Sequence, residues 1–438
     1  MKEQSNIPTS KVLRASKFVQ TGAKIGGNYI KHYAKKMVDP SRDKSELDRD
    51  NADDIFNSLS QLKGSALKVA QMMAMDKNLL PKSYQDKFSL AQYSAPPLSY
   101  PLVAKSFMRE FGKGPSEIFD TFTQSAVNAA SIGQVHRATI KDQKLAVKIQ
   151  YPGVSESIKS DLKIVKPFAV RLFNISTAEL EHYLEEVEGK LIEETDYQLE
   201  VRRSIEISEA CAHIENLRFP KYYPEYSGKR IITMDWMEGQ HMKEFLATNP
   251  SQEARNRAGQ ALWDFYDYQI YTLKQVHADP HPGNFLFSKD GSTGILDFGC
   301  VKVIPEDFHK SYFRLINKDL VTNEEELLQI FHELSFLHPE DSPREREIFI
   351  GIFKQMIYLL GQPFHFDTFD FGNDDYFNEI FQLGEKISGM KEVRNAKVAR
   401  GSRHGLYVNR TYFGLYNLLN DLKAKVNTGI KNRVALRA

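Results

Sequence analysis

A short run about two thirds of the way along the chain contains residues that could carry out catalysis. Within the run Val276–Phe287, Asp279 and Asn284 stand five residues apart, and Asp297-Phe298-Gly299 follows directly after Gly294-Ile295-Leu296. A carboxylate beside a nucleophile can take up its proton, and carboxylate and amide oxygens are hard ligands that suit Mg²⁺. We therefore predict a phosphate-handling site in which Asn284 and Asp297 hold Mg²⁺.

The order and spacing of these residues are those of a kinase catalytic loop, in which Asp279 would orient the acceptor. Two other interpretations exist. His277, Asp279 and His281 could be ligands of zinc or iron, but that site would leave Asn284 and the Asp-Phe-Gly unexplained. The run could also be a proline-rich turn whose polar side chains form only local hydrogen bonds. An Asp-Phe-Gly placed after this loop favours the kinase-like interpretation.

A lysine in an alternating segment is the candidate phosphate-binding cation. In the predicted strand 145–149, Lys148 and Ala146 share one face, so Lys148 would neutralise nucleotide phosphates while Ala146 covers the adenine. The alternative is a solvated strand lysine. An orienting carboxylate should lie on the helical region predicted at about 184–214, and the candidates are Glu193, Glu194, Asp196 and Glu200. Asp196 and Glu200 are four apart and would share a helix face, although a solvated acidic face has the same pattern.

Further motifs resemble those of the UbiB/AarF family of atypical kinases, which includes the mitochondrial ADCK proteins. The motifs are Lys68-Val69-Ala70-Gln71, similar to Lys-x-Gly-Gln; Asn128–Val135, similar to an alanine-rich loop; and Glu194-Thr195-Asp196, similar to Glu-x-Asp. The likeness extends from about Leu62 to Gly299, and Phe413-Gly414-Leu415-Tyr416 is also similar. Ala70 replaces the usual glycine and Asn128 the first alanine, and either change could alter how closely these segments pack.

This resemblance implies an α+β, bilobal, protein-kinase-like fold with a mainly helical C-terminal lobe. A helical N-terminal extension would pack over the active site, with Lys68 and Gln71 in its motif and Lys68 near Glu194 and Asp196. Such an extension would obstruct protein substrates. Glu200 takes the place of the glutamate that pairs with Lys148.

The resemblance also implies Mg²⁺-dependent ATP binding. Met234 would guard the pocket behind the adenine, and the backbone of Asp235 and Met237 would contact it. An alanine-rich loop has less backbone freedom than a glycine-rich one and should lie less closely over the phosphates. The residues expected to contact ATP are Asn128, Ala129, Ala130, Ser131, Ala146, Lys148, Met234, Asp235 and Met237.

Three functions are compatible with these residues. The family resemblance implies an ATPase or small-molecule or lipid kinase that supports isoprenoid quinone biosynthesis or membrane lipid homeostasis, with a lipid or quinone precursor as acceptor. The second function is a nucleotide-gated scaffold that performs no phosphotransfer. The third is a soluble small-molecule phosphotransferase, against which the N-terminal motifs count. The sequence does not define the oligomeric state.

The elements that must position these residues can be predicted from periodicity. We expect a linker over 39–54, an amphipathic helix over 55–73, helix over 100–122, strands within 125–150 and 230–237, and mostly helix thereafter. The expected domains are a basic segment with linker (1–50), a helical extension (51–122), an N-lobe (123–239) and a C-lobe (240–438). A chain of 438 residues is long enough for two lobes.

Composition limits the partners. The net charge of +1 provides no general electrostatic field that would attract nucleic acid, and two cysteines provide no disulfide framework.

The segment 11–38 has seven Lys/Arg, no acidic residue and the apolar residues Val12, Leu13, Phe18, Val19 and Ile25, so it could contact an anionic membrane. Its start lacks the features of a secretory signal. The apolar stretch 348–361 is too short to span a bilayer and is expected to be a buried helix. We therefore expect a cytoplasmic protein, peripheral at most to the inner face of a membrane.

Overall fold

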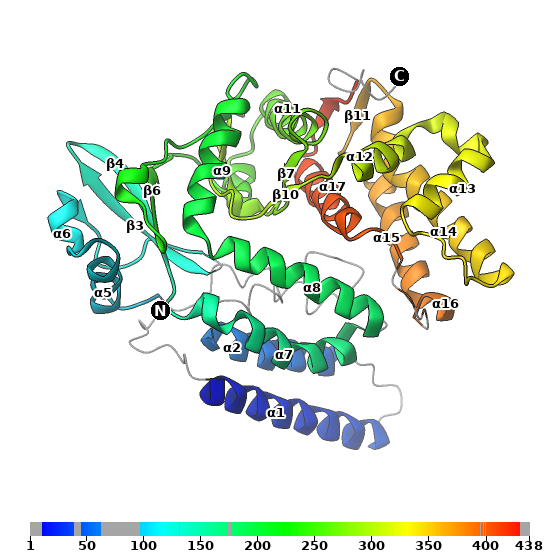
Figure 1. Ribbon diagram of the computed structural model, residues 1–438, viewed down its shortest axis with the longest axis horizontal. Helices are drawn as coiled ribbons and strands as arrows, with labels where there is room; N and C mark the ends of the chain where they lie inside the picture. Colours follow the sequence, from blue (N-terminus) through cyan, green and yellow to red (C-terminus); the bar gives the residue numbers. More distant parts are fainter. Residues whose placement is uncertain are drawn as a thin grey trace. The chain divides into compact units, whose positions relative to one another are not determined.

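The computed structural model describes residues 11–38, 45–62, 97–130, 132–173, 177–394, 396, 398 and 400–429. The chain divides into two compact units (Figure 1). The N-terminal unit comprises Met1–Arg202 and Lys221–Trp236, and the C-terminal unit comprises Arg203–Pro220 and Met237–Ala438. The finer boundaries expected after residues 50, 122 and 239 stay predictions.

The N-terminal unit contains an antiparallel sheet in the order β1-β3-β4-β6, with β2 also paired to β3. Its strands are β1 (Thr121–Phe122), β2 (Asn128–Ala129), β3 (Gly133–Ile140), β4 (Gln143–Gln150) and β6 (Ile231–Asp235). A tight turn at Lys141 and Asp142, both with positive φ, joins β3 to β4. The register places Lys148 between Val135 and Ile232 in the middle of the sheet. The strands predicted within 125–150 and 230–237 are thus confirmed.

The helical region predicted over 100–122 is confirmed as far as Ile118, but it is divided into two helices. The structure has α5 (Tyr100–Phe111) and α6 (Pro115–Ile118), followed by β1. Gly112 adopts a left-handed conformation with φ of 68° and ends α5, and Pro115 begins α6. These two residues divide what the periodicity had suggested was one helical region.

Two N-terminal helices lie alongside each other, α1 (Lys11–Val38) and α2 (Ser45–Leu62) (Figure 1). The linker predicted over 39–54 is therefore wrong from Ser45 onward. Acidic residues in the first turn of α2 suit a helix N-terminus, and Leu47, Asn51 and Ala52 are buried on one side of it. The buried position of Asn51, to which Asn28 of α1 donates a 3.1 Å hydrogen bond, hid this pattern from a hydrophobicity-based prediction. The helix predicted over 55–73 is described only as far as Leu62.

The acidic region forms two helices, where the sequence suggested a single helical stretch. After α7 (Val154–Phe173), the chain forms α8 (Thr177–Glu194) and α9 (Tyr197–Ala210), the last of which begins in the N-terminal unit and continues into the C-terminal one. The break occurs at Thr195–Asp196, where Asp196 Oδ1 accepts a 3.0 Å hydrogen bond from Leu199 N. Asp196 is therefore an exposed N-cap of α9, and the predicted shared helix face with Glu200 is wrong.

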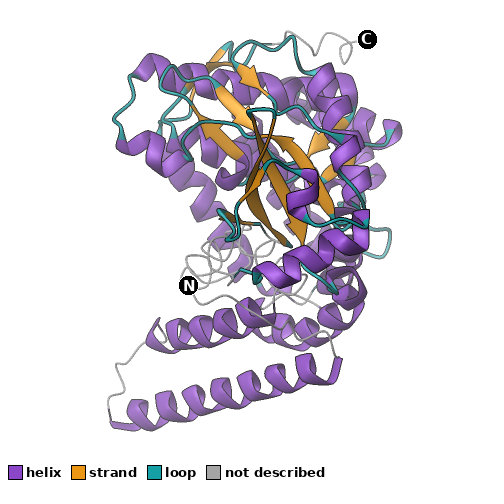
Figure 2. Ribbon diagram, turned by 90° about the vertical axis from the view of Figure 1, so that its left-hand side faces the viewer, coloured by secondary structure: helices purple, strands orange, loops and turns teal. Residues whose placement is uncertain are grey.

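The C-terminal unit is mostly helical, as predicted. Its helices are α10 (Met242–Ala247), α11 (Gln252–Tyr268), α12 (Glu306–Tyr312), α13 (Glu324–Glu333), α14 (Pro343–Gly361), α15 (Asp374–Gly389), α16 (Lys391–Arg394) and α17 (Arg403–Asp421). Its strands are β5 (Leu217–Arg218), β7 (Gln275–His277), β8 (Phe285–Phe287), β9 (Thr293–Ile295), β10 (Val301–Val303), β11 (Thr368–Asp370) and β12 (Lys425–Asn427). They form small sheets, β5-β9-β8, β7-β10 and β11-β12. Figure 2 shows the helices of the protein in purple and its strands in orange.

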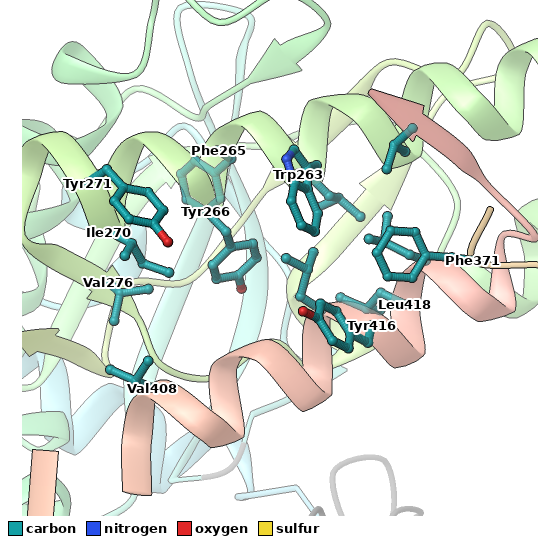
Figure 3. Packing of buried hydrophobic residues seen from close by; sticks show 14 of the residues in the cluster. Trp263, Phe265, Tyr266, Ile270, Tyr271, Val276, Phe371, Val408, Tyr416 and Leu418 are labelled. Carbon is teal, nitrogen blue, oxygen red and sulfur yellow. The ribbon is translucent and has the colours of Figure 1, made fainter. Parts of the chain in front are cut away.

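Part of the core of this unit lies between α11 and α17. Figure 3 shows Trp263 and Tyr266 of α11 above Val408 and Tyr416 of α17, with Val276 of β7 among them. A five-residue π-helix, η3 (Gln269–Leu273), extends α11 and leads into β7. The core therefore holds β7, and the loop that follows it, against two long helices.

Helix α14 includes the apolar stretch predicted to be a buried helix. Phe349 and Ile352 are buried, whereas Tyr358 is exposed, so the helix is confirmed but only one of its faces is covered. Among the helices that the structure describes, none combines the length and apolar character needed to cross a bilayer.

Candidate active site

The loop after β7 brings Asp279 and Asn284 together. Pro280 and Pro282 restrict its backbone, His281 N donates to Asp279 O at 2.7 Å, and Asn284 N donates to His281 O at 2.9 Å. Within this tight turn, Asn284 Nδ2 donates to Asp279 O at 2.9 Å and lies 3.4 Å from Asp279 Oδ2. Both side chains are buried. The two predicted catalytic-loop residues are thus held as one rigid group.

The Asp-Phe-Gly segment is attached directly to this loop. Leu296 N donates to Asn284 O at 3.0 Å, and Asp297 Oδ1 accepts a 2.7 Å hydrogen bond from Gly299 N. Phe298 is fully buried, while Asp297 is only partly buried. Asn284 therefore supplies an amide oxygen and Asp297 supplies carboxylate oxygens, from two neighbouring segments of the chain. These donor atoms suit Mg²⁺.

His277 is buried and is held by contacts with neighbouring residues. Its Nδ1 lies 2.9 Å from the Tyr266 hydroxyl, its backbone N–H donates to Gln269 Oε1 at 2.9 Å, and its ring contacts Phe285 and Phe298. Burial, followed by the nearby Asp279, raises the pKa of Tyr266 well above its usual value, so this partner stays neutral.

The zinc or iron interpretation of His277, Asp279 and His281 has no geometric support. His281 Nδ1 accepts a hydrogen bond from Gly283 N at 3.0 Å. Over the part of the chain that the structure describes, no group of three or more His, Cys, Asp or Glu side chains is arranged to hold a metal ion. The histidines of this loop serve to shape it.

In the N-terminal unit, Lys148 of β4 pairs with Glu200 of α9. Lys148 Nζ lies 2.7 Å from Glu200 Oε1, and the two side chains are only 7% and 2% exposed. The ammonium also lies 5.2 Å from the centre of the buried Tyr197 ring. Gln150 Nε2 donates to Thr195 O at 2.9 Å, which attaches β4 to the junction between α8 and α9. The structure thus brings together the lysine and the carboxylate that the resemblance paired.

The other candidate carboxylates have different positions. Glu193 pairs with Lys190 at 3.0 Å, Glu194 is buried near the end of α8, and Asp196 caps α9. Lys68, Ala70 and Gln71 lie outside the described residues. The predicted approach of Lys68 to Glu194 and Asp196 therefore stays a prediction.

The alanine-rich loop is a tight hairpin between β2 and β3. Asn128 and Ala129 pair with Val135 and Gln134, and the loop is closed by Ala130 N to Gly133 O at 2.9 Å and Gly133 N to Ala130 O at 3.4 Å. Ser131 lies outside the described residues. The backbone amides of Ala130 and Gly133 are used to close the loop. They are therefore not directed toward phosphate oxygens, as the amides of a glycine-rich phosphate loop are.

The predicted adenine region is formed in part by the centre of the sheet. Ala146 and Met234 are buried partners across β4 and β6. The carboxylate of Asp235 accepts hydrogen bonds from the Tyr223 hydroxyl and Gln143 Nε2, both at 2.9 Å. Burial and this carboxylate raise the pKa of Tyr223 to about 12. Met237, the other predicted adenine-contacting residue, belongs to the C-terminal unit.

One residue beside the predicted catalytic loop was not anticipated from the sequence. Arg410 of α17 donates from Nη2 to Asp279 Oδ1 at 3.0 Å. It lies 131 residues further along the chain, and local spacing therefore contains no signal for the pair. The one feature of the sequence that pointed to this helix was the similarity of Phe413-Gly414-Leu415-Tyr416 to the UbiB/AarF family.

Comparison with known proteins identifies the family. A family model described as the ABC1 atypical kinase-like domain matches residues 90–331, which is more than half of the chain. The chain belongs to the ABC1 atypical kinase-like family. The matched range includes Lys148, Glu200, Asp279, Asn284 and Asp297. The α+β kinase-like fold predicted from the sequence is confirmed.

Relatives of this ABC1 protein extend the match. It is 29% identical to the atypical kinase COQ8, mitochondrial, of Saccharomyces cerevisiae over 97% of this chain and 84% of that protein. It is 29% identical to AarF domain-containing protein kinase 1 of Xenopus laevis over 74% of this chain and 64% of that protein. These names confirm the UbiB/AarF resemblance.

A solved structure is similar to most of the ABC1 protein. It is the complex of Rv3197 with erythromycin from Mycobacterium tuberculosis, with 26% identity and a TM-score of 0.58. The match covers 88% of this chain and 95% of that one. The two folds are therefore similar over most of this chain.

Proposed function

We propose that this ABC1 protein binds Mg²⁺ and ATP and either hydrolyses ATP or transfers its terminal phosphoryl group to a small molecule or lipid. The observation that carries this proposal is the presence of a nearly buried Lys148–Glu200 pair in one unit and of Asp279, Asn284 and Asp297 on adjoining segments of the other. A buried ion pair is weak evidence for stability, because apolar residues of similar size often stabilise a core as well or better. Its presence in the centre of a sheet supports a functional role.

Each residue has a part in the proposed reaction. Lys148, oriented by Glu200, neutralises charge on the ATP phosphates, and Asn284 with Asp297 would hold Mg²⁺. When bound, this ion would supply positive charge that stabilises the negative charge developing on the phosphates. Asp279 orients the attacking hydroxyl or water and accepts its proton as a new P–O bond forms and the bond to the ADP oxygen breaks.

The test is Mg²⁺-dependent phosphate release from ATP by the purified protein, compared with Asp297→Asn. Asp290→Asn is a matched control, since this exposed carboxylate in the turn after β8 undergoes the same chemical change. We expect turnover in the wild type and in the control and none in Asp297→Asn. Equal turnover in all three would refute the assignment. ATP binding without any release would favour a nucleotide-gated scaffold.

We also propose that the protein acts at a membrane, in isoprenoid quinone biosynthesis or membrane lipid homeostasis. In support, α1 exposes Ile30, Tyr33 and Met37 along one stripe, with the exposed Lys31 and Lys35 beside it. These residues lie further along the helix than the apolar residues chosen from the sequence. Flotation with anionic liposomes should fall for a variant with serine at the three apolar positions. Equal flotation of variant and wild type would contradict peripheral binding.

A further inference from the structure

Helix α17 contacts the loop that contains Asp279. Arg410 Nη2 lies 3.0 Å from Asp279 Oδ1, and the two side chains are 12% and 11% exposed. Asp279 Oδ2, on the other side of the same carboxylate, lies 3.4 Å from Asn284 Nδ2. The orientation of the carboxylate is therefore set by an arginine on one oxygen and an amide near the other.

A second contact shows that α17 is fitted closely to this loop. Gly414 is one helical turn beyond Arg410, and a Cβ atom at this position would overlap Pro280 Cγ and lie 2.9 Å from Pro280 Cβ. The absence of a side chain at Gly414 therefore allows the helix to approach the residue that follows Asp279. Figure 3 shows the same helix packed through Val408 and Tyr416 against the core around β7. The position of Arg410 is thus fixed by packing on both sides of it.

We propose that Arg410 is a positioning residue for Asp279. Its charge stabilises the nearly buried carboxylate, and its hydrogen bond fixes the orientation from which Asp279 accepts the acceptor's proton. This inference rests on the proposed phosphate-transfer function. The planar guanidinium is suited to this role, because it offers directed donors that a lysine lacks.

The expected kinetic effect is specific. A general base contributes about 10²–10⁴-fold to a rate, and poor placement can remove roughly 10²-fold of it. Arg410→Gln should therefore lower kcat by about 30-fold to 100-fold. The KM for ATP should change by less than about twofold, because the groups proposed to bind ATP are Lys148, Asn284 and Asp297. Arg410→Lys should recover part of kcat, since it restores the charge without the geometry.

A double-mutant cycle tests whether Arg410 acts through Asp279. Single-turnover phosphate release is measured for the wild type, Arg410→Gln, Asp279→Asn and the double variant. If Arg410 acts only on the carboxylate, the double variant should be no slower than Asp279→Asn. A merely structural residue would lower the rate by the same factor in both backgrounds.

Arg400→Gln is the matched control for loss of a buried arginine. Arg400 bonds to Asp341 at 2.5 Å and to Phe336 O, and the two charged side chains are 10% and 7% exposed. This control should lower the melting temperature and leave kcat unchanged. Should Arg410→Gln fail to fold, the cycle is run with Arg410→Lys.

The outcomes distinguish the two proposals. No Mg²⁺-dependent consumption of ATP by the wild type, whether or not lipid vesicles are added as acceptor, would overturn both. Wild-type turnover that depends on Asp297, together with an unchanged kcat or an additive cycle for the Arg410 variants, would overturn the role of Arg410 alone.

Discussion

Replacing Glu200 by glutamine would remove the charged partner of Lys148 while almost preserving the shape of the side chain. The two atoms that pair, Lys148 Nζ and Glu200 Oε1, are 2.7 Å apart, and both side chains are almost completely buried. The ammonium would remain in a site from which water is largely excluded. The change therefore tests electrostatics with little disturbance of packing.

The size of the effect follows from the burial. Breaking a buried ion pair by removing one partner costs about 3–5 kcal/mol, and we expect about 3 kcal/mol because glutamine can still accept a hydrogen bond. Each kcal/mol shifts the melting temperature of a domain of 150–250 residues by roughly 2–4 °C, so a decrease of about 6–12 °C is expected. ATP binding should weaken by about tenfold or more, because Lys148 would no longer be held in place to contact the phosphates. A tenfold loss corresponds to about 1.4 kcal/mol of binding free energy.

A matched control separates burial from loss of charge. Glu156 lies 2.9 Å from Arg230 Nη2 in the same unit, but its side chain is 62% exposed. Glu156→Gln should therefore change stability by no more than about 1 kcal/mol. Differential scanning calorimetry with and without Mg²⁺ and ATP measures both effects. A decrease for Glu200→Gln no larger than that for Glu156→Gln would refute the reasoning.

Two further predictions concern the hairpin and a distant ion pair. Gly133→Ala should lower the melting temperature and weaken ATP binding severalfold, because the added Cβ would lie 2.5 Å from Ile149 O; wild-type values in both measurements would contradict this. The pKa of Asp341 is lowered mainly by its hydrogen bonds with Arg400, so this pair stabilises the fold fully above the unfolded-state pKa of about 3.9 and loses that effect as the pH falls through the lower folded-state pKa. Urea titrations measure the difference in unfolding free energy between the wild type and Asp341→Asn. This difference should be about 3 kcal/mol at pH 6 and should shrink below pH 4. A difference that does not change with pH would show the reasoning to be wrong.

The parts of the site that were predictable from sequence are those encoded by local spacing. Asp279 and Asn284 are five residues apart, so one turn holds them together whatever surrounds it. The alternation around Lys148 likewise defines a strand and a face. In both cases the information lies within ten residues.

What could not be predicted depends on long-range packing. Choosing Glu200 among four carboxylates needed either a family resemblance or the contact with Lys148 that only the fold reveals. Asp196 could have been recognised as an N-cap, because aspartate is favoured there, but the uninterrupted acidic pattern suggested one helix. The start of α2 was missed because a polar residue, Asn51, occupies a buried position. Arg410 was missed because nothing near Asp279 in the sequence marks its partner.

The most direct test of the central claim is ATP-dependent Mn²⁺ binding, with Mn²⁺ as a spectroscopic substitute for Mg²⁺, followed by electron paramagnetic resonance. The wild type and Asp290→Asn should bind Mn²⁺ in the presence of ATP, and Asp297→Asn should bind it much more weakly. Such a result requires no turnover and would support Asp297 as a ligand of the nucleotide-bound metal. Equal Mn²⁺ binding by Asp297→Asn and the wild type would contradict the proposed site.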